Sequence, residues 1–135
     1  MAPVKTPKSN ALGRLFVIFI EEYLPRRGMT THTIHSYRDS LELLLRFVAA
    51  HRQCGFEALN LEHLTAAQIE KFLADLERTR GNAISTRNTR LAALRTFARF
   101  AATEAPEHLL ELQRVLAIPF KRGKQRLPLK YLGPR

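Results

Sequence analysis

Apolar side chains recur every three or four residues along most of the chain, which is the spacing of one face of an α-helix. Turn-forming residues, mostly proline and glycine, separate the apolar stretches. The pattern predicts five helices: 11–24, 30–52, a third from 64–65 to the turn at 80–82, a fourth at 85–100 that ends by 103–105, and 106–117. We therefore expect an all-α bundle with short connections.

The first predicted helix is apolar nearly all round. Its main face carries five side chains: Leu12, Leu15, Phe16, Phe19 and Tyr23. Val17 and Ile18 point elsewhere. The run at 15–20 also fits a strand, but no other segment is suited to pair with it. We expect a helix that Pro25 ends, with its second face covered by another helix or by a partner protein.

The second predicted helix opens with polar residues suited to an anion. Thr30 or Thr31 is expected to cap it, and His32, His35 and Ser36 follow on or near its polar side. Free backbone N–H groups at a helix start favour phosphate, so these side chains are candidates for phosphate or base-edge contact. Two histidines at i and i+3 without a third ligand do not predict a metal site, and we expect no metal or cofactor.

The third and fifth predicted helices are expected to serve the core. Thr65 and Gln68 form a capping box at the start of the third helix. Its solvent side mixes both signs of charge, which argues against DNA contact along most of its length. Pro106 is suited to the first position of the fifth helix. The expected apolar face of the fifth helix is Leu109, Leu112 and Leu116.

The fourth predicted helix combines an apolar stripe with an arginine-rich face. Ser85 is its expected N-cap. At roughly 100° per residue, Asn88, Arg95 and Arg99 fall on one face, flanked by Ser85 and Thr89. Arginine pairs with guanine, asparagine with adenine, and hydroxyls with phosphate oxygens, so this face suits the DNA major groove. The alternative is a solvated basic face without a ligand.

Three further polar residues of the fourth helix lie outside that face. Arg87 is in the first turn, near the edge of the apolar stripe, and is expected to reach a phosphate. Thr86 is a further candidate for DNA contact. Arg90 lies toward the buried side and is expected to extend past Phe97 to water.

The formal net charge of +10 is concentrated in two stretches. Residues 78–103 hold six basic residues and no acid, and residues 118–135 also hold six and none. The remainder holds ten basic and twelve acidic residues. Segregated positive charge of this kind indicates a polyanion partner.

Both ends of the chain are basic and contain proline. Residues 1–10 are expected to form a flexible basic arm. Residues 119–135 read as a basic linker without its own fold, and we expect it to be mobile. Lys121, Arg122 and Lys124 of this linker are candidates for phosphate contact.

The single cysteine, Cys54, excludes an intrachain disulfide and a cysteine-based zinc site. This composition agrees with a reducing cytoplasm. No secretory signal is visible, and the apolar run at 15–20 is far shorter than the roughly 20 residues that span a bilayer. We expect a cytoplasmic, nucleoid-associated protein that does not contact a membrane.

Three segments and the basic ending resemble the N-terminal core-binding domain of tyrosine recombinases, the phage integrases and their transposon relatives. The segments are Thr31-x-Thr33-x-x-x-Tyr37-x-x-x-Leu41 to Phe47, Leu64-Thr65-x-x-x-Ile69-x-x-Phe72-Leu73-x-x-Leu76, and Ser85-Thr86-Arg87-Asn88-x-Arg90-Leu91-Ala92-Ala93-Leu94-Arg95-x-Phe97-x-x-Phe100. The ending Ile118-Pro119-Phe120-Lys121-Arg122 resembles the family's linker. The resemblance covers about residues 11–135.

The resemblance implies a SAM-like helical bundle at 11–118. Such a module lies on one side of duplex DNA with its second and fourth helices toward the major groove. The catalytic domain of the same parent protein closes the clamp from the other side, and neighbouring protomers bind the same DNA. One departure is Glu104-Ala105-Pro106, where the family often has an Asn-Pro turn.

The resemblance also bears on catalysis. The family's chemistry needs a nucleophilic tyrosine, an arginine pair, a lysine and a His-x-x-Arg element around the phosphate. We find none of this set here: Tyr23 and Tyr37 belong to apolar stripes, and Tyr131 lies in the linker. The chain is therefore expected to bind DNA without cleaving it, as part of a recombinase or a short relative of one.

Two other classes of function remain open. A helical protein–protein interaction module would explain the surplus apolar residues Val17, Ile18 and Ile20. An RNA-binding helical domain would share the charge pattern, but aromatic residues that stack on bases are not found on the polar faces.

Overall fold

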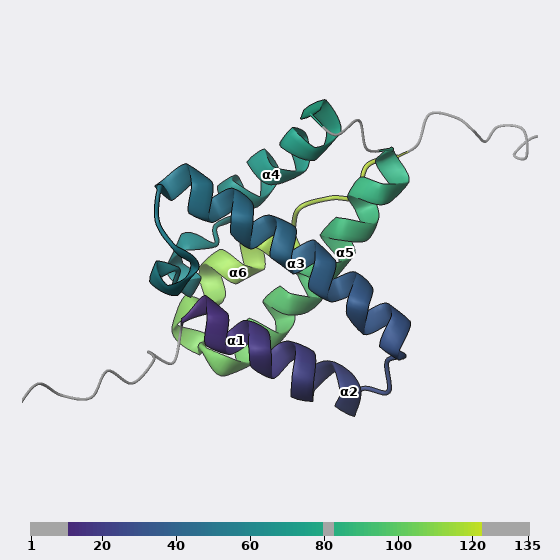
Figure 1. Cartoon of the computed structure of the whole chain (residues 1–135), viewed down its shortest axis with the longest axis vertical. Helices are drawn as coiled ribbons and strands as arrows, with labels where there is room; N and C mark the ends of the chain where they lie inside the picture. Colours follow the sequence, from purple (N-terminus) through teal and green to yellow (C-terminus); the bar gives the residue numbers. More distant parts are fainter. Residues whose placement is uncertain (1–10, 80–82, 123–135) are drawn as a thin grey trace, which may run out of the picture.

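The computed structural model describes residues 11–79 and 83–122 of the chain, and this part is all-α (Figure 1). Its α-helices are α1 (Leu12–Ile18), α2 (Leu24–Arg26), α3 (Thr31–Arg52), α4 (Ala66–Thr79), α5 (Ile84–Glu104) and α6 (Leu109–Leu116). A π-helical segment, Phe19–Tyr23, joins α1 to α2, and short 3₁₀ turns lie at Phe56–Ala58, Leu61–His63 and Pro106–His108. The predicted fold class is confirmed.

The first predicted helix is one continuous rod made of α1, the π-helical segment and α2. Within the π-helical segment the Leu24 N–H donates to the carbonyl of Phe19, five residues earlier. Pro25, which has no N–H to place, is accommodated inside the last turn and does not end the helix as predicted. The rod ends at Arg26, and the turn that follows includes Gly28, whose φ of 75° is the left-handed conformation that glycine adopts easily.

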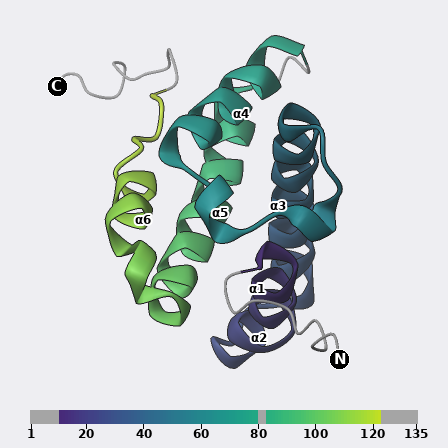
Figure 2. The same cartoon turned by 90° about the vertical axis from the view of Figure 1, so that its left-hand side faces the viewer.

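The centre of the bundle is α5, which runs between α3 and α6 in Figure 2 and also packs against α4. It buries side chains on more than one side, including Leu91, Leu94 and Phe97. The fully buried ring of Phe19 lies 5.2 Å from the Phe97 ring and 5.4 Å from the Phe100 ring, between centroids. These contacts join α5 to the first rod and fix the position of α5 in the fold.

Predicted capping bonds are present at two helix starts, and the second of them is one half of the predicted capping box. Thr30 is the N-cap of α3, and its hydroxyl accepts a hydrogen bond from the Thr33 N–H at 3.1 Å. The Thr65 hydroxyl accepts from the Gln68 N–H at 3.1 Å at the start of α4. A carboxylate oxygen of Glu111, on α6, accepts from the adjacent Ala66 N–H at 2.8 Å. A distant acid thus satisfies a backbone donor at this helix start.

Two local predictions were wrong. Ser85 is not a cap: α5 begins at Ile84 after Ala83, and the Ala83 carbonyl accepts from the Arg87 N–H at 3.0 Å. In the last helix the first turn is 3₁₀, which changes the helical register, so Leu109 is 44% exposed. The buried positions there are Leu112, Val115 and Ile118.

Candidate nucleic-acid interface

The first two turns of α3 present an exposed polar surface. Thr31, His32 and His35 are exposed, as predicted from the pattern, and Ser36 is half-buried. Arg38 is also exposed and lies three residues beyond His35, on the same side of the helix. Arg38 was not among the predicted site residues, although the i, i+3 spacing could have identified it.

On α5 the exposed polar positions recur at helical spacing. Ser85, Thr89 and Arg99 are exposed, and Thr86 and Thr96 are half-buried. The Thr89 hydroxyl donates to the Ser85 carbonyl at 3.0 Å, and the Thr96 hydroxyl donates to the Ala92 carbonyl at 3.1 Å. The guanidinium of Arg99 has no hydrogen bond or ion pair with the described residues. Arg99 is therefore the arginine of this helix best placed to meet a ligand.

A side-chain contact joins α3 and α5 where they cross (Figure 1). Arg90 Nη1 donates to the Ser40 hydroxyl at 3.2 Å, and that hydroxyl donates to the Ser36 carbonyl at 3.2 Å. Ser40 is buried, and the Nε of Arg90 is buried without a partner in the described part of the chain. Arg90 therefore reaches α3 and does not extend past Phe97 to water as predicted. The contact fixes the crossing from which the starts of both helices diverge.

Arg87 lies inside the protein, with 7% of its surface exposed. Its Nη1 donates to the Asn88 side-chain oxygen at 3.0 Å and to the Pro119 carbonyl at 3.3 Å. The expectation that Arg87 faces a phosphate from the edge of the apolar stripe is corrected by this placement. A buried guanidinium needs hydrogen-bond partners, and two oxygens of the protein supply them.

Asn88 and Arg95 also contact the segment that follows α6. The Asn88 amide donates to the Lys121 carbonyl at 2.8 Å and accepts from the Lys121 N–H at 3.0 Å. The guanidinium of Arg95 lies 4.9 Å from the centre of the Phe120 ring. Asn88, Arg95 and Arg99 were predicted to share a DNA-facing surface. Among these three, only Arg99 has no contact with the described part of the segment that follows α6.

The basic linker residues differ in their surroundings. The Lys121 ammonium pairs with the Glu77 carboxylate of α4 at 2.9 Å. Arg122 is exposed. Lys124, the arm at 1–10 and the rest of the linker lie outside the described residues. Because they are 44 residues apart, the Glu77–Lys121 pair could not be identified from local spacing.

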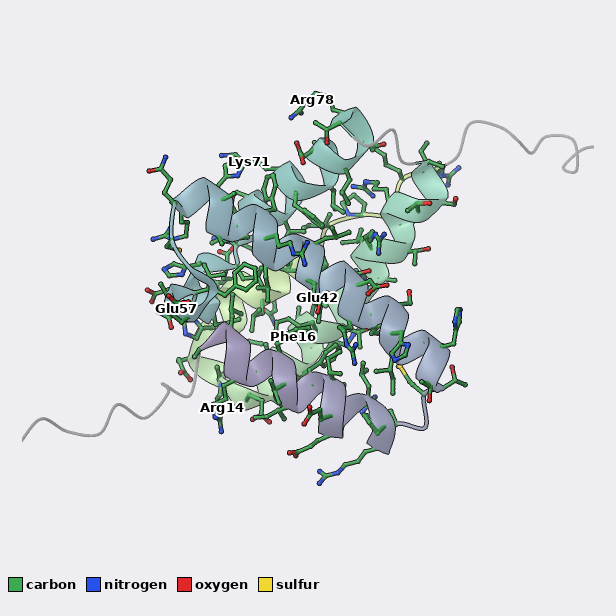
Figure 3. The ribbon with its side chains drawn as sticks, viewed as in Figure 1. Arg14, Phe16, Glu42, Glu57, Lys71 and Arg78 are labelled. Carbon is green, nitrogen blue, oxygen red and sulfur yellow. The ribbon has the colours of Figure 1, made fainter. Side chains whose placement is uncertain are left out.

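The charged side of α4 lies away from the start of α3. Figure 3 shows Lys71 and Arg78 along the outer edge of α4, on the opposite side of the picture from the beginning of α3. Arg78 pairs with Asp75 at 3.0 Å, one turn earlier. This local neutralisation agrees with the prediction that the third helix carries a mixed, solvated face.

Metal clusters, membrane spans and disulfides are absent from the described residues. In 11–79 and 83–122, no three histidine, cysteine, aspartate or glutamate side chains come together as a metal site. Across these ranges, no helix combines the length and apolar character needed to cross a membrane. The half-buried thiol of Cys54 forms no disulfide. The candidate site is the polar surface on α3 and α5 described above.

The fold and this surface define an all-α module with arginine concentrated on its central helix. Residues 17–105 match the family described as phage integrase, N-terminal SAM-like domain. The match covers more than half of the chain, and the chain belongs to this family. The resemblance to the N-terminal domain of tyrosine recombinases is thereby confirmed.

Two curated relatives come from Sinorhizobium fredii (strain NBRC 101917 / NGR234). "Putative integrase/recombinase y4rC" is 43% identical over 104 residues, which are 77% of this chain and 31% of the relative. "Putative integrase/recombinase y4rD" is 42% identical over 114 residues, which are 81% of this chain and 41% of the relative. The chain thus spans less than half the length of either protein. No solved structure matches it.

Proposed function

We propose that this domain binds duplex DNA as the N-terminal half of a clamp in a site-specific tyrosine recombinase. The first two turns of α3 and the exposed side of α5 would lie toward the major groove. The observation that carries the proposal is the fixed crossing at Ser40 and Arg90, which holds two polar helix surfaces in one arrangement. Exposed His32, Arg38 and Arg99 supply groups that bond to phosphates or base edges.

We infer that the chemistry of the parent protein resides in a separate catalytic domain. Two of the chain's three tyrosines lie in the described part, and both pack in the aromatic core. Phe19 stacks with Tyr23 at 5.5 Å and with Tyr37 at 6.3 Å between ring centroids. Such packing suits a structural role better than that of a nucleophile. A covalent DNA–tyrosine adduct formed by this chain alone would contradict the inference.

Salt dependence tests the DNA-binding function most directly. Binding of the chain to a labelled duplex is measured by fluorescence anisotropy at several salt concentrations. If about four to eight phosphates are neutralised, log K should fall with log salt at a slope of roughly −4 to −7. A slope near zero would contradict the proposal. Competition by structured RNA separates duplex DNA binding from the RNA-binding alternative.

A protein-interaction role is favoured by one other observation. Val17 and Phe56 are 51% and 52% exposed beside a hollow of about 280 Å³ that Phe16 and Leu45 also line. Exposed apolar surface of this kind is typical of partner sites. This function predicts that Val17→Ser abolishes partner binding and leaves DNA affinity unchanged, which pull-down and anisotropy assays of the same variant would measure.

A further inference from the structure

The segment that follows α6 remains attached to the bundle as far as Lys121. Its contacts come from three residues of α5 and one of α4: Arg87, Asn88, Arg95 and Glu77. We call these four side chains, together with residues 119–121, the clasp. Its polar partners are 32 to 44 residues apart in the sequence. A segment held only by local contacts would show none of these bonds.

The geometry at Asn88 fixes orientation as well as position. One amide group bonds to both the N–H and the carbonyl of a single residue, Lys121. A single bond would let the Lys121 backbone rotate, whereas two bonds, one to its N–H and one to its carbonyl, fix its orientation. The buried guanidinium of Arg87 donates to the oxygen of the same amide and to the Pro119 carbonyl. It therefore also holds the Asn88 side chain in position.

The two remaining clasp contacts lie at the surface. Phe120 is 47% exposed, and the guanidinium of Arg95 lies over its ring. The Lys121 ammonium bonds to both carboxylate oxygens of Glu77, at 2.9 and 3.2 Å. Cation–π contacts and exposed ion pairs are each weak. They add to the clasp, but the Asn88 amide determines its register.

We propose that Asn88 is a positioning residue for the linker and does not read a base. The clasp fixes Lys121 and Arg122 beside the start of α5, so the first charges of the linker form part of the domain surface. A charge held in place loses less conformational entropy on binding than a charge on a free chain. The effect on DNA affinity rests on the DNA-binding function proposed above, and the existence of the clasp does not.

The first experiment tests the clasp without DNA. Amide hydrogen exchange at Lys121 is measured by NMR in the full chain and in Asn88→Ala. Protection of the Lys121 N–H is expected in the parent chain and should be lost in the variant. Thr89→Ala, one position away on the exposed side of α5, should retain it. Unprotected Lys121 in the parent chain would overturn the proposal, whatever the result with DNA.

The second experiment is a double-mutant cycle on DNA with Asn88→Ala and Arg122→Gln. Alone, Asn88→Ala should weaken binding about two- to tenfold, equally on matched and scrambled duplexes, which is the range expected for one loosened side chain. The loss should shrink when Arg122 is already replaced, because the clasp acts through that charge. A loss confined to the matched duplex and independent of Arg122 would show that Asn88 reads a base and overturn the proposal.

A second variant, which loosens the clasp only at its weaker surface contact, guards against misfolding. Phe120→Ala removes an exposed ring and leaves α5 intact, so the bundle should keep its circular dichroism spectrum and melting temperature. The same coupling to Arg122 is expected. Unchanged DNA affinity in both folded variants would reduce the clasp to a purely structural contact and overturn the positioning role. Absence of any DNA binding with Lys121 still protected would instead refute the proposed function.

Discussion

The starts of α3 and α5 are both rich in polar side chains, but they use them differently. On α3, His32, His35 and Arg38 are exposed. On α5, Arg87 and Asn88 bond to the chain that follows α6. The difference arises because the segment that follows α6 passes alongside the start of α5. Residue types suited to DNA can therefore serve the protein itself, and contacts from distant segments decide which role they have.

The largest expected effect is on stability, at the buried arginine of α5. Arg87→Met removes charged hydrogen bonds to two protein oxygens and should lower the free energy of unfolding by about 1.5–3 kcal/mol. Arg99→Met removes the same charge from an exposed site on the same helix and should stay within about 0.5 kcal/mol of the parent. Urea denaturation of both variants measures the contrast. Equal effects would mean that Arg87 has no structural role.

A smaller effect is expected at the crossing of the two helices. Ser40→Ala removes the hydroxyl that accepts from Arg90, and should lower the free energy of unfolding by about 0.5–1.5 kcal/mol. Ser36→Ala is the matched control, because Ser36 contributes only its backbone carbonyl to this contact. Thermal unfolding measures the stability of both variants. An equal loss of stability in the two would contradict the role of the crossing.

The ion pair of the clasp should affect DNA binding more than stability. Glu77→Gln frees the Lys121 ammonium and removes a negative charge near the linker. The Asn88 amide still fixes the Lys121 backbone, so the freed ammonium can meet a phosphate. Binding should therefore become tighter, and the salt slope should become steeper by about one. Stability should change by no more than about 1 kcal/mol, as is usual for an exposed pair. Glu70→Gln on the exposed face of the same helix is the control, and an identical gain there would indicate a net-charge effect.

Much of the fold could be predicted from periodicity, because α-helices with one buried face repeat apolar residues in a fixed way. The caps at Thr30 and Thr65 were also predictable, since each side chain bonds to a backbone group three residues away. Prediction failed where a local rule competed with packing. Ser85 is a good cap residue, but the N-cap of α5 is Ala83, two residues earlier. Leu109 fits the apolar stripe, but a 3₁₀ turn displaces it.

The candidate site was less predictable than the fold. Exposed His32, His35 and Arg99 were identified because the unpaired side of a helix follows from its apolar stripe. The contacts of Asn88 with Lys121 and of Arg90 with Ser40 join residues 33 and 50 positions apart. No local spacing encodes such contacts. Helical angles placed Asn88 beside Arg95 and Arg99, but they could not reveal that its side-chain amide bonds to Lys121.

The central claim is that DNA lies on the first two turns of α3 and the exposed side of α5, and two arginines of α3 test it most directly. Arg38 and Arg52 are both exposed and are 14 residues apart, or about 21 Å along a helix at 1.5 Å per residue. The measurement is the salt slope of duplex binding for Arg38→Gln and Arg52→Gln, which carry the same change in net charge. We predict that Arg38→Gln weakens binding and flattens the slope by about one, while Arg52→Gln leaves the slope unchanged. Equal small losses in both variants would contradict the claim, since DNA would then respond to net charge alone.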